Sequence, residues 1–545
     1  MLRKSIFLFI IGLYFFSCQP TKEYGDKVIF RYNVPEGITS LDPAFSSLLG
    51  NVSATNQLFN GLVQADENLN LKECIAKSWE VLDSGKLYRF HLRKDVNFHR
   101  HPLFGKDSTR TVVAADFVYS FNRLIDSKLI SPGKWVMNEV ARNERDQLKM
   151  LALNDTTLDI YLKRPFPPFL GILSMQYCSV VPSEVVEGLG EGFRSQPIGT
   201  GPFRFQFWKE NIKLVYLKNE YYFETDEEGN QLPFLDAVAI SFIKDQEVSF
   251  LKFLKKELDL LSGLKGSYKD ELLNSRGELR EKYNAVVNFN TTPYLNSEYL
   301  GFLVDSSIEN SQQNKALRRA INFGFDRSKM LTYLRSGIGF PAQHGFIPRG
   351  LPSFTEGLQG FSYQPDSVRK LLIEAGFPNG KGLDPVVLST TPQYLDICEY
   401  LQSQLSEFGI SIKIEVNQAA TNNELVANSR LSFFRKSWVA DYPDAENYLS
   451  LFKSENFAPN GPNYTHYKNV QYDDWYNAAM ETVSDSLRYV YYQKMDSTII
   501  ADAPIVPLFY DEVVRFTQPI IHDLGMNPMN LLVLKYVKKE IIKDN

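Results

Sequence analysis

Several short segments alternate apolar and polar residues, which is the pattern of a strand with one face buried. These segments are residues 87–92, 158–162, 203–207 and 410–416. Helical spacing occurs between them: Phe117 and Phe121 are followed by Leu124 and Ile125, and Asp116 lies in the expected first turn. The charge of an aspartate there complements the helix dipole. Strands and helices therefore alternate along the chain.

Residues 386–416 predict a βαβ unit. A strand at 386–388 is followed by a helix from Leu395 to Phe408, a stop at Gly409 and the strand 410–416. Such a unit joins two parallel strands through a right-handed crossover. The predicted class is therefore α/β or α+β, arranged in several lobes.

The chain has 545 residues, which corresponds to roughly three to four domains of usual size. It contains no repeat of fixed period and no Gly/Ser-rich or Pro-rich linker, so we expect lobes that interleave. The net charge of −5 provides no basic surface for nucleic acid. Aromatic residues make up 13% of the chain, and their rings belong either in a large core or on a surface that faces a ligand.

The amino terminus predicts a secretion signal. Residues 1–5 are a short basic segment with Arg3 and Lys4, and residues 6–16 form an uncharged apolar run. As a helix this run would rise only ~16 Å, about half of a bilayer core. We therefore assign residues 1–17 to a signal peptide. Cys18 follows directly and resembles the acylated cysteine of bacterial lipoproteins. A signal peptide cut nearby without lipidation is the alternative.

Motifs for chemistry are missing from the sequence. The segment 376–382 fails the phosphate-loop pattern, and there is neither a GxSxG elbow nor an HExxH zinc motif. His91, His99 and His101 have no nearby cysteine, and we interpret them as surface or loop histidines. We therefore predict no catalytic residue, no metal and no cofactor.

One short segment favours recognition of a cation. Asp441 lies between Trp438 and Tyr442, after the apolar run 431–434, which suggests a buried strand that ends in an acidic turn. A carboxylate beside aromatic faces at a strand end suits a group such as an ammonium.

Nine motifs in register carry a resemblance over nearly the whole mature chain. They are Leu41–Pro43, Leu58–Leu62, Ala76–Trp79, Tyr88–Asp95, Ala114–Ser120, Gly199–Phe203, Asn314–Asp326, Lys370–Gly376 and Trp438–Asp444. The chain resembles the oligopeptide/dipeptide-binding family (family 5) of extracellular solute-binding proteins that serve ABC importers.

The resemblance implies a two-lobed α/β fold of the periplasmic-binding-protein type, with an extra subdomain in the first lobe. The first lobe is expected to combine residues 18–59, 183–294 and 509–545. Residues 60–182 form the expected extra subdomain and residues 295–508 the second lobe. The strand within 504–510 would be one hinge crossing.

The resemblance also implies the site. Asp441 matches the aspartate that holds a peptide's α-ammonium in relatives, beside Trp438. The backbone of Ser437 to Val439 would pair with the peptide as an extra strand, opposed by Ser47, Leu48 and Leu49. Arg435 matches an arginine that lines the site, with a surface role as the alternative. Tyr394 stands where oligopeptide binders have a histidine, which leaves the site for the ligand carboxylate open.

We therefore expect a monomeric lipoprotein, exported to the periplasm or cell surface and anchored to a bacterial membrane through Cys18. It would deliver peptides to an ABC permease and its ATPase, without binding nucleic acid and without catalysis. Three alternatives stay open: a binder of an oligosaccharide, nickel complex or haem; a secreted hydrolase; and an adhesin or sensor that keeps the fold.

Overall fold

The computed structural model describes residues 27–264, 266–305, 307 and 310–541. The predicted signal peptide, residues 1–17, and the predicted lipidation site, Cys18, lie outside these residues. Within the described ranges, no helix is both long enough and apolar enough to cross a bilayer.

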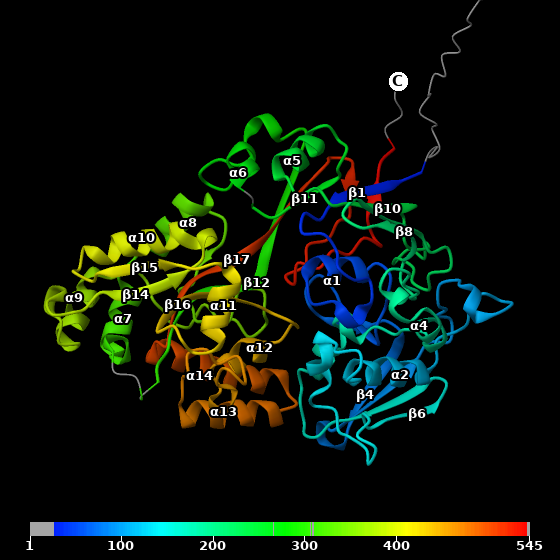
Figure 1. Cartoon of the computed structure of the whole chain (residues 1–545), viewed down its shortest axis with the longest axis horizontal. Coiled ribbons are helices and arrows are strands. Elements are labelled where there is room, and N and C mark those ends of the chain that lie inside the picture. Colours follow the sequence, from blue (N-terminus) through cyan, green and yellow to red (C-terminus); the bar gives the residue numbers. More distant parts are fainter. Residues whose placement is uncertain (1–26, 265, 306, 308–309, 542–545) are drawn as a thin grey trace, which may run out of the picture.

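A mixed sheet of eleven strands runs through the protein (Figure 1). In spatial order it consists of β15 (Ile412–Val416), β14 (Val386–Thr390), β16 (Phe433–Val439), β12 (Asn288–Phe302), β17 (Ile505–Thr517), β11 (Leu260–Ser262), β1 (Ile29–Asn33), β10 (Ala237–Ser241), β9 (Lys213–Lys218) and β8 (Phe203–Lys209), with β13 (Phe340–Pro341) beside β17. Strands β14 and β15 are parallel, with Val386 opposite Ile412, and α10 (Leu395–Ser406) joins them. The predicted βαβ unit is therefore confirmed.

Strands β12 and β17 belong to both halves of this sheet. Residues 288–293 of β12 pair with 512–517 of β17, on the side where β17 also pairs with β11. Residues 297–301 pair with 505–510, on the side where β12 also pairs with β16. The register shifts between Pro293 and Ser297 and again between Glu298 and Tyr299. Such irregularities let a strand bend, so the two halves are joined at a bend.

A separate four-stranded sheet lies beside the half of the large sheet that contains β1 and β8 to β11 (Figure 1). It has the order β4 (Ala76–Leu82), β5 (Leu87–Leu92), β7 (Thr157–Tyr161) and β6 (Met150–Asn154). Helix α2 (Ala114–Ile125) packs on it with Phe117 and Phe121 fully buried, as the helical spacing predicts. The carboxylate of Asp116 accepts the backbone N–H of Val113 at 2.9 Å and so caps the first turn.

The remaining elements cover these sheets or connect them. They are β2 (Val63–Ala65), β3 (Leu71–Glu73), β18 (Ile521–His522), β19 (Lys538–Lys539), α1 (Leu49–Thr55), α3 (Phe169–Leu173), α4 (Ser183–Leu189), α5 (Gln246–Leu254), α6 (Gly266–Leu272), α7 (Lys315–Phe323), α8 (Arg327–Arg335), α9 (Pro365–Glu374), α11 (Ala419–Ala427), α12 (Glu446–Leu449), α13 (Val470–Glu481) and α14 (Asp485–Asp502). Helices α7 to α10 share one buried apolar cluster with β14 and β16.

The segment Gly199–Pro202 has no regular secondary structure and bends into β8. A Cβ atom on Gly199 or Gly201 would collide with the backbone of Leu58, which explains why glycine occupies both positions. The amide of Gly201 donates to the carbonyl of Leu58 at 2.8 Å. This contact fixes the chain just after α1, which borders the cleft described next.

Candidate ligand-binding cleft

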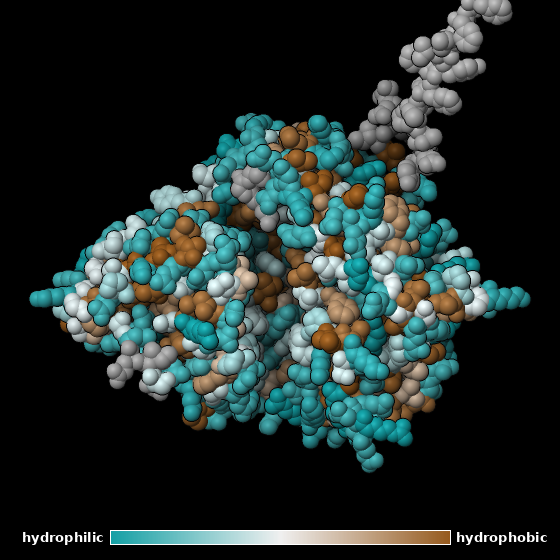
Figure 2. All heavy atoms as spheres, in the orientation of Figure 1, coloured by the Kyte–Doolittle hydropathy of each residue, from teal (hydrophilic) through white to brown (hydrophobic). Residues whose placement is uncertain are grey.

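A cleft of about 1500 Å³ lies between the two halves of the protein, and Figure 2 shows the groove that separates them. Its walls come from the segments 46–57 and 64–72, from the turns 132–135, 174–177 and 222–228, from the hinge strand β12, from residues 439–443 after β16, and from the tail 517–538. Both halves and the four-stranded-sheet body therefore contribute side chains to one cavity.

Asp441 lines this cleft just beyond the end of β16. Its backbone N–H donates to Oδ1 of Asn447 at 3.1 Å, and Nδ2 of Asn447 lies 3.4 Å from its carboxylate. Nε1 of Trp438 donates to the same Oδ1 at 2.8 Å. Asn447 is buried and so fixes the turn that presents the carboxylate.

The carboxylate of Asp441 has no cationic partner among the described residues. Its surface is open to the solvent of the cleft, yet the surrounding protein desolvates it enough to raise its pKa above the usual value. A ligand cation would offset that desolvation. The geometry therefore suits an ammonium group.

An aromatic wall stands close to Asp441. Trp135 and Tyr177 line the cleft, and the ring of Trp135 lies 6.2 Å from that of Tyr442. Burial raises the pKa of Tyr177 to about 12, and the charge of Asp441 adds to the shift. Trp438, which was predicted to lie beside the ligand, and Tyr442, which follows Asp441 in the sequence, are not among its lining residues; Tyr442 is buried behind the wall.

Strand β16 has an open edge at the cleft. On one side Ser437 and Val439 pair with Glu298 and Asn296 of β12. On the other side, within the described chain, β16 meets β14 only at Phe434. The backbone beyond that point can accept another strand.

The segment Ser47 to Leu49, which was predicted to lie opposite β16 across the ligand, leads into α1. Ser47 and Leu49 line the cleft, and Leu48 and Leu49 are exposed at 54% and 46%. Val439 is the one residue of β16 that lines the cavity; Ser437 does not.

Arg435 and Tyr394 lie against each other, away from the cleft lining. The guanidinium carbon of Arg435 is 3.0 Å from the centre of the Tyr394 ring, and the guanidinium also forms an ion pair with Glu298. The side chains of Arg435 and Glu298 are both buried, and burial raises the pKa of Glu298. Direct contact of Arg435 and Tyr394 with a ligand stays a prediction.

Glu446, five positions after Asp441, is a buried carboxyl group. The hydroxyls of Tyr442 and Tyr476 both donate to Glu446, and burial raises the pKa of Glu446 to about 7. Asp444, the other acid of the predicted motif, accepts from Tyr492 and pairs with Arg488 at 3.2 Å. It therefore holds the helices rather than facing the ligand.

Sequence analysis missed several residues of this site. Asn447 follows Asp441 by six positions on α12, and that spacing was the only local signal. Trp135 and Tyr177 come from the distant segment 60–182, so nothing near Asp441 in the sequence points to them.

Two lobes that share a hinge and enclose a cleft with an unpaired carboxylate define a solute-binding protein. The family model described as "Bacterial extracellular solute-binding proteins, family 5 Middle" matches residues 70–460, and the chain belongs to this family. The predictions of family, two-lobed α/β fold and a binding protein instead of an enzyme are confirmed.

Relatives of the chain carry different ligand names. It is 25% identical to heme-binding protein A of Haemophilus influenzae over 89% of this chain and 85% of the relative. It is 24% identical to the dipeptide-binding protein of Escherichia coli over 84% of each. The structure of the periplasmic binding protein DppA from Helicobacter pylori in complex with the peptide STSA superposes with a TM-score of 0.74 at 23% identity, covering 94% of this chain and 98% of that one.

The buried pair of Glu298 and Arg435 predicts a stability effect. Replacing Arg435 by alanine leaves the Glu298 carboxylate buried without its partner, so Arg435→Ala should lower the free energy of unfolding by about 3–5 kcal/mol. The double variant Glu298→Gln/Arg435→Met leaves no unpaired buried charge, so its free energy of unfolding should fall much less. Urea denaturation of the parent, the single variants Glu298→Gln and Arg435→Met, and the double variant measures the coupling; an Arg435→Ala protein as stable as the parent would contradict the assignment.

Glu446 predicts a dependence of stability on pH. Its pKa is raised from 4.5 to about 7 in the folded protein. Between those values the unfolded chain releases the proton more readily, so the free energy of unfolding falls as pH rises, by on the order of 3 kcal/mol. Glu446→Gln cannot release a proton and should lose less stability over that interval. Denaturation at several pH values measures the slope.

A matched control for this experiment is Glu399→Gln, which changes an exposed glutamate on α10. It should keep the slope of the parent. Asp496, whose buried carboxyl also has its pKa raised to about 7, contributes equally to all three proteins. A Glu446→Gln slope equal to that of the parent would show that Glu446 ionises normally.

Proposed function

We propose that this protein captures peptides in the cleft, holds their α-ammonium at Asp441, and delivers them to an ABC permease and its ATPase. The observation that carries the proposal is the unpaired carboxylate of Asp441 beside the open edge of β16. An ammonium has three donors and loses hydration on entering the cleft, so it needs a carboxylate. The family model and the relatives named for peptides support the same function.

The peptide backbone is proposed to add to β16 at Ser437 to Val439, with Ser47 to Leu49 opposite. Main-chain pairing supplies affinity that does not depend on side chains, and in the described chain the edge of β16 opposite β12 has no strand partner at these residues. Arg435 and Tyr394 are proposed to act mainly by holding β16 in place, because Arg435 is already paired with Glu298.

Binding is proposed to close the lobes by bending β12 and β17. The moving units would be residues 18–59, 183–294 and 509–545, with the extra subdomain 60–182, against residues 295–508. The register shift between Pro293 and Ser297 supports a boundary there. A ligand that contacts both lobes shifts the equilibrium toward the closed state, which the permease would recognise. We further propose a monomer, exported and anchored to the membrane through an acylated Cys18.

Haem is a second candidate ligand, because one relative is named heme-binding protein A. Haem carries two carboxylates and an iron that takes axial ligands such as histidine. No histidine or arginine is found among the described residues that line the cleft. Tyrosine and methionine, which do line the cleft, can also ligate iron, but the two haem carboxylates would meet no arginine there. Titration with haemin should therefore give no saturable absorption band; a saturable band would favour this candidate.

Removal of the proposed anchor should abolish the preference for a free amino terminus. Asp441→Ala should weaken binding of a free peptide by at least about a hundredfold, because the ammonium then loses its counter-charge. Acetylating the amino terminus of the peptide should weaken its binding to the parent protein by the same factor. Calorimetry measures the affinity of both proteins for both peptides. The acetylated peptide should bind the parent protein and Asp441→Ala with equal affinity.

A melting temperature of Asp441→Ala close to that of the parent would show that the fold is intact. Equal affinity of the two proteins for the free peptide would overturn the anchor.

A further inference from the structure

The charged side chains that line the cleft are strongly unbalanced. Three are lysines: Lys72, Lys535 and Lys538. Seven are carboxylates: Asp66, Glu67, Asp226, Glu227, Glu228, Asp441 and Asp523. The lining therefore has a formal excess of four negative charges, whereas the whole chain carries −5. The cleft thus holds a large share of the protein's net charge.

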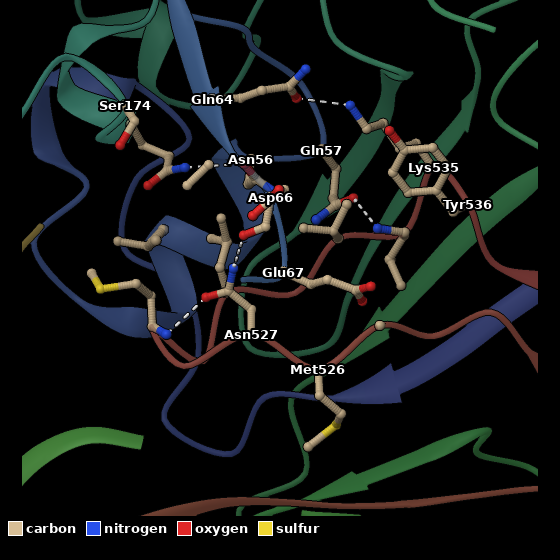
Figure 3. A pocket seen from close by; sticks show the side chains of 18 of the residues that line it. Asn56, Gln57, Gln64, Asp66, Glu67, Ser174, Met526, Asn527, Lys535 and Tyr536 are labelled. Atoms are coloured by element: carbon tan, nitrogen blue, oxygen red, sulfur yellow. Dashed lines mark hydrogen bonds between the residues drawn. The ribbon is translucent and has the colours of Figure 1, made fainter. Parts of the chain in front are cut away.

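Each of the three lysines is already paired. Lys535 is buried, forms an ion pair with Glu224, and donates to the side-chain oxygen of Gln64 at 2.8 Å; Figure 3 shows this contact. The ammonium of Lys538 lies 3.1 Å from Asp523. The ammonium of Lys72 lies 3.7 Å from Asp66. Each of these lysines therefore already has a carboxylate partner before a ligand enters.

Most of the excess acids come from two turns. Glu67 lies in the turn between β2 and β3, exposed to solvent. Asp226 accepts the backbone N–H of Asn230 at 2.7 Å and so closes a second turn, which carries the exposed Glu227 and Glu228. Within the described residues, no ion pair neutralises Glu67, Glu227 or Glu228. These turns leave fixed negative charge around the cavity.

We infer that the cleft selects peptides with positive side chains and does not require a free carboxyl terminus, an inference that rests on the proposed peptide-binding function. The cavity is the proposed binding site, and the excess of negative charge in its lining is the reason for the preference for positive side chains. The negative charges on its walls create a negative potential that attracts a cationic ligand and repels an anionic one. A terminal carboxylate would find no lysine in the lining without a carboxylate partner and would have to compete with that partner.

Two peptides that differ at one residue, and there by two units of charge, test the inference. Ala-Ala-Lys-Ala-Ala and Ala-Ala-Glu-Ala-Ala, both with a free amino terminus, are titrated into the full chain by calorimetry. The lysine peptide should bind at least about tenfold more tightly, and added salt should narrow the ratio because it screens exposed charges. The lysine peptide with an amidated carboxyl terminus should bind as tightly as the free acid, or more tightly.

Variants of the second turn localise the effect. Asp226→Asn, Glu227→Gln and Glu228→Gln, combined in one protein, should reduce the preference for lysine several-fold. The matched control combines Glu374→Gln, Glu399→Gln and Glu424→Gln, three exposed acids on α9, α10 and α11 outside the cleft, and should keep it. Melting curves confirm that both proteins are folded.

The outcomes separate the two proposals. Equal affinity for both peptides, a preference for glutamate, or a turn variant that keeps the full ratio overturns the charge preference while peptide binding stands. A loss of about tenfold or more on amidation overturns the part that concerns the carboxyl terminus. Binding of neither peptide overturns the proposed function and this inference with it.

Discussion

The pairing of β12 with β17 is the constraint on which the rest of the structure depends. Each strand serves one half of the large sheet at one end and the other half at the other end. The lobes therefore cannot be separate segments of chain, which accounts for a sequence of this length without flexible linkers. The register shifts near Pro293 and Glu298 place the bend beside the cleft, so ligand contacts on both sides can act on it.

Charged groups in and behind the cleft divide into those that are paired and those that are not. Arg435 with Glu298, Lys535 with Glu224, and Arg488 with Asp444 are mutually compensated. Paired groups of this kind fix side chains in position but offer little to a ligand. Asp441 has no such partner among the described residues. The lysines that line the cleft are thus each paired, whereas the carboxylate of Asp441 is left for the ligand.

Local patterns in the sequence predicted local elements well. The alternation at 87–92 and the βαβ unit at 386–416 appear as β5 and as β14, α10 and β15, because each depends on neighbours in the chain. The position of Asp441 in the cleft also followed from its motif. Asn447, Trp135 and the occupied state of Arg435 could not be predicted, because each depends on contacts between distant segments. Glu298 lies 137 positions from Arg435, and no periodicity encodes that pairing.

Native mass spectrometry of the protein isolated from cells that export it, followed by fragmentation of whatever is released, tests the central claim most directly. The account predicts a set of added masses that fragment at peptide bonds, with lysine- and arginine-containing peptides enriched over acidic ones. A single bound species without peptide bonds, such as a sugar or a haem, would contradict it.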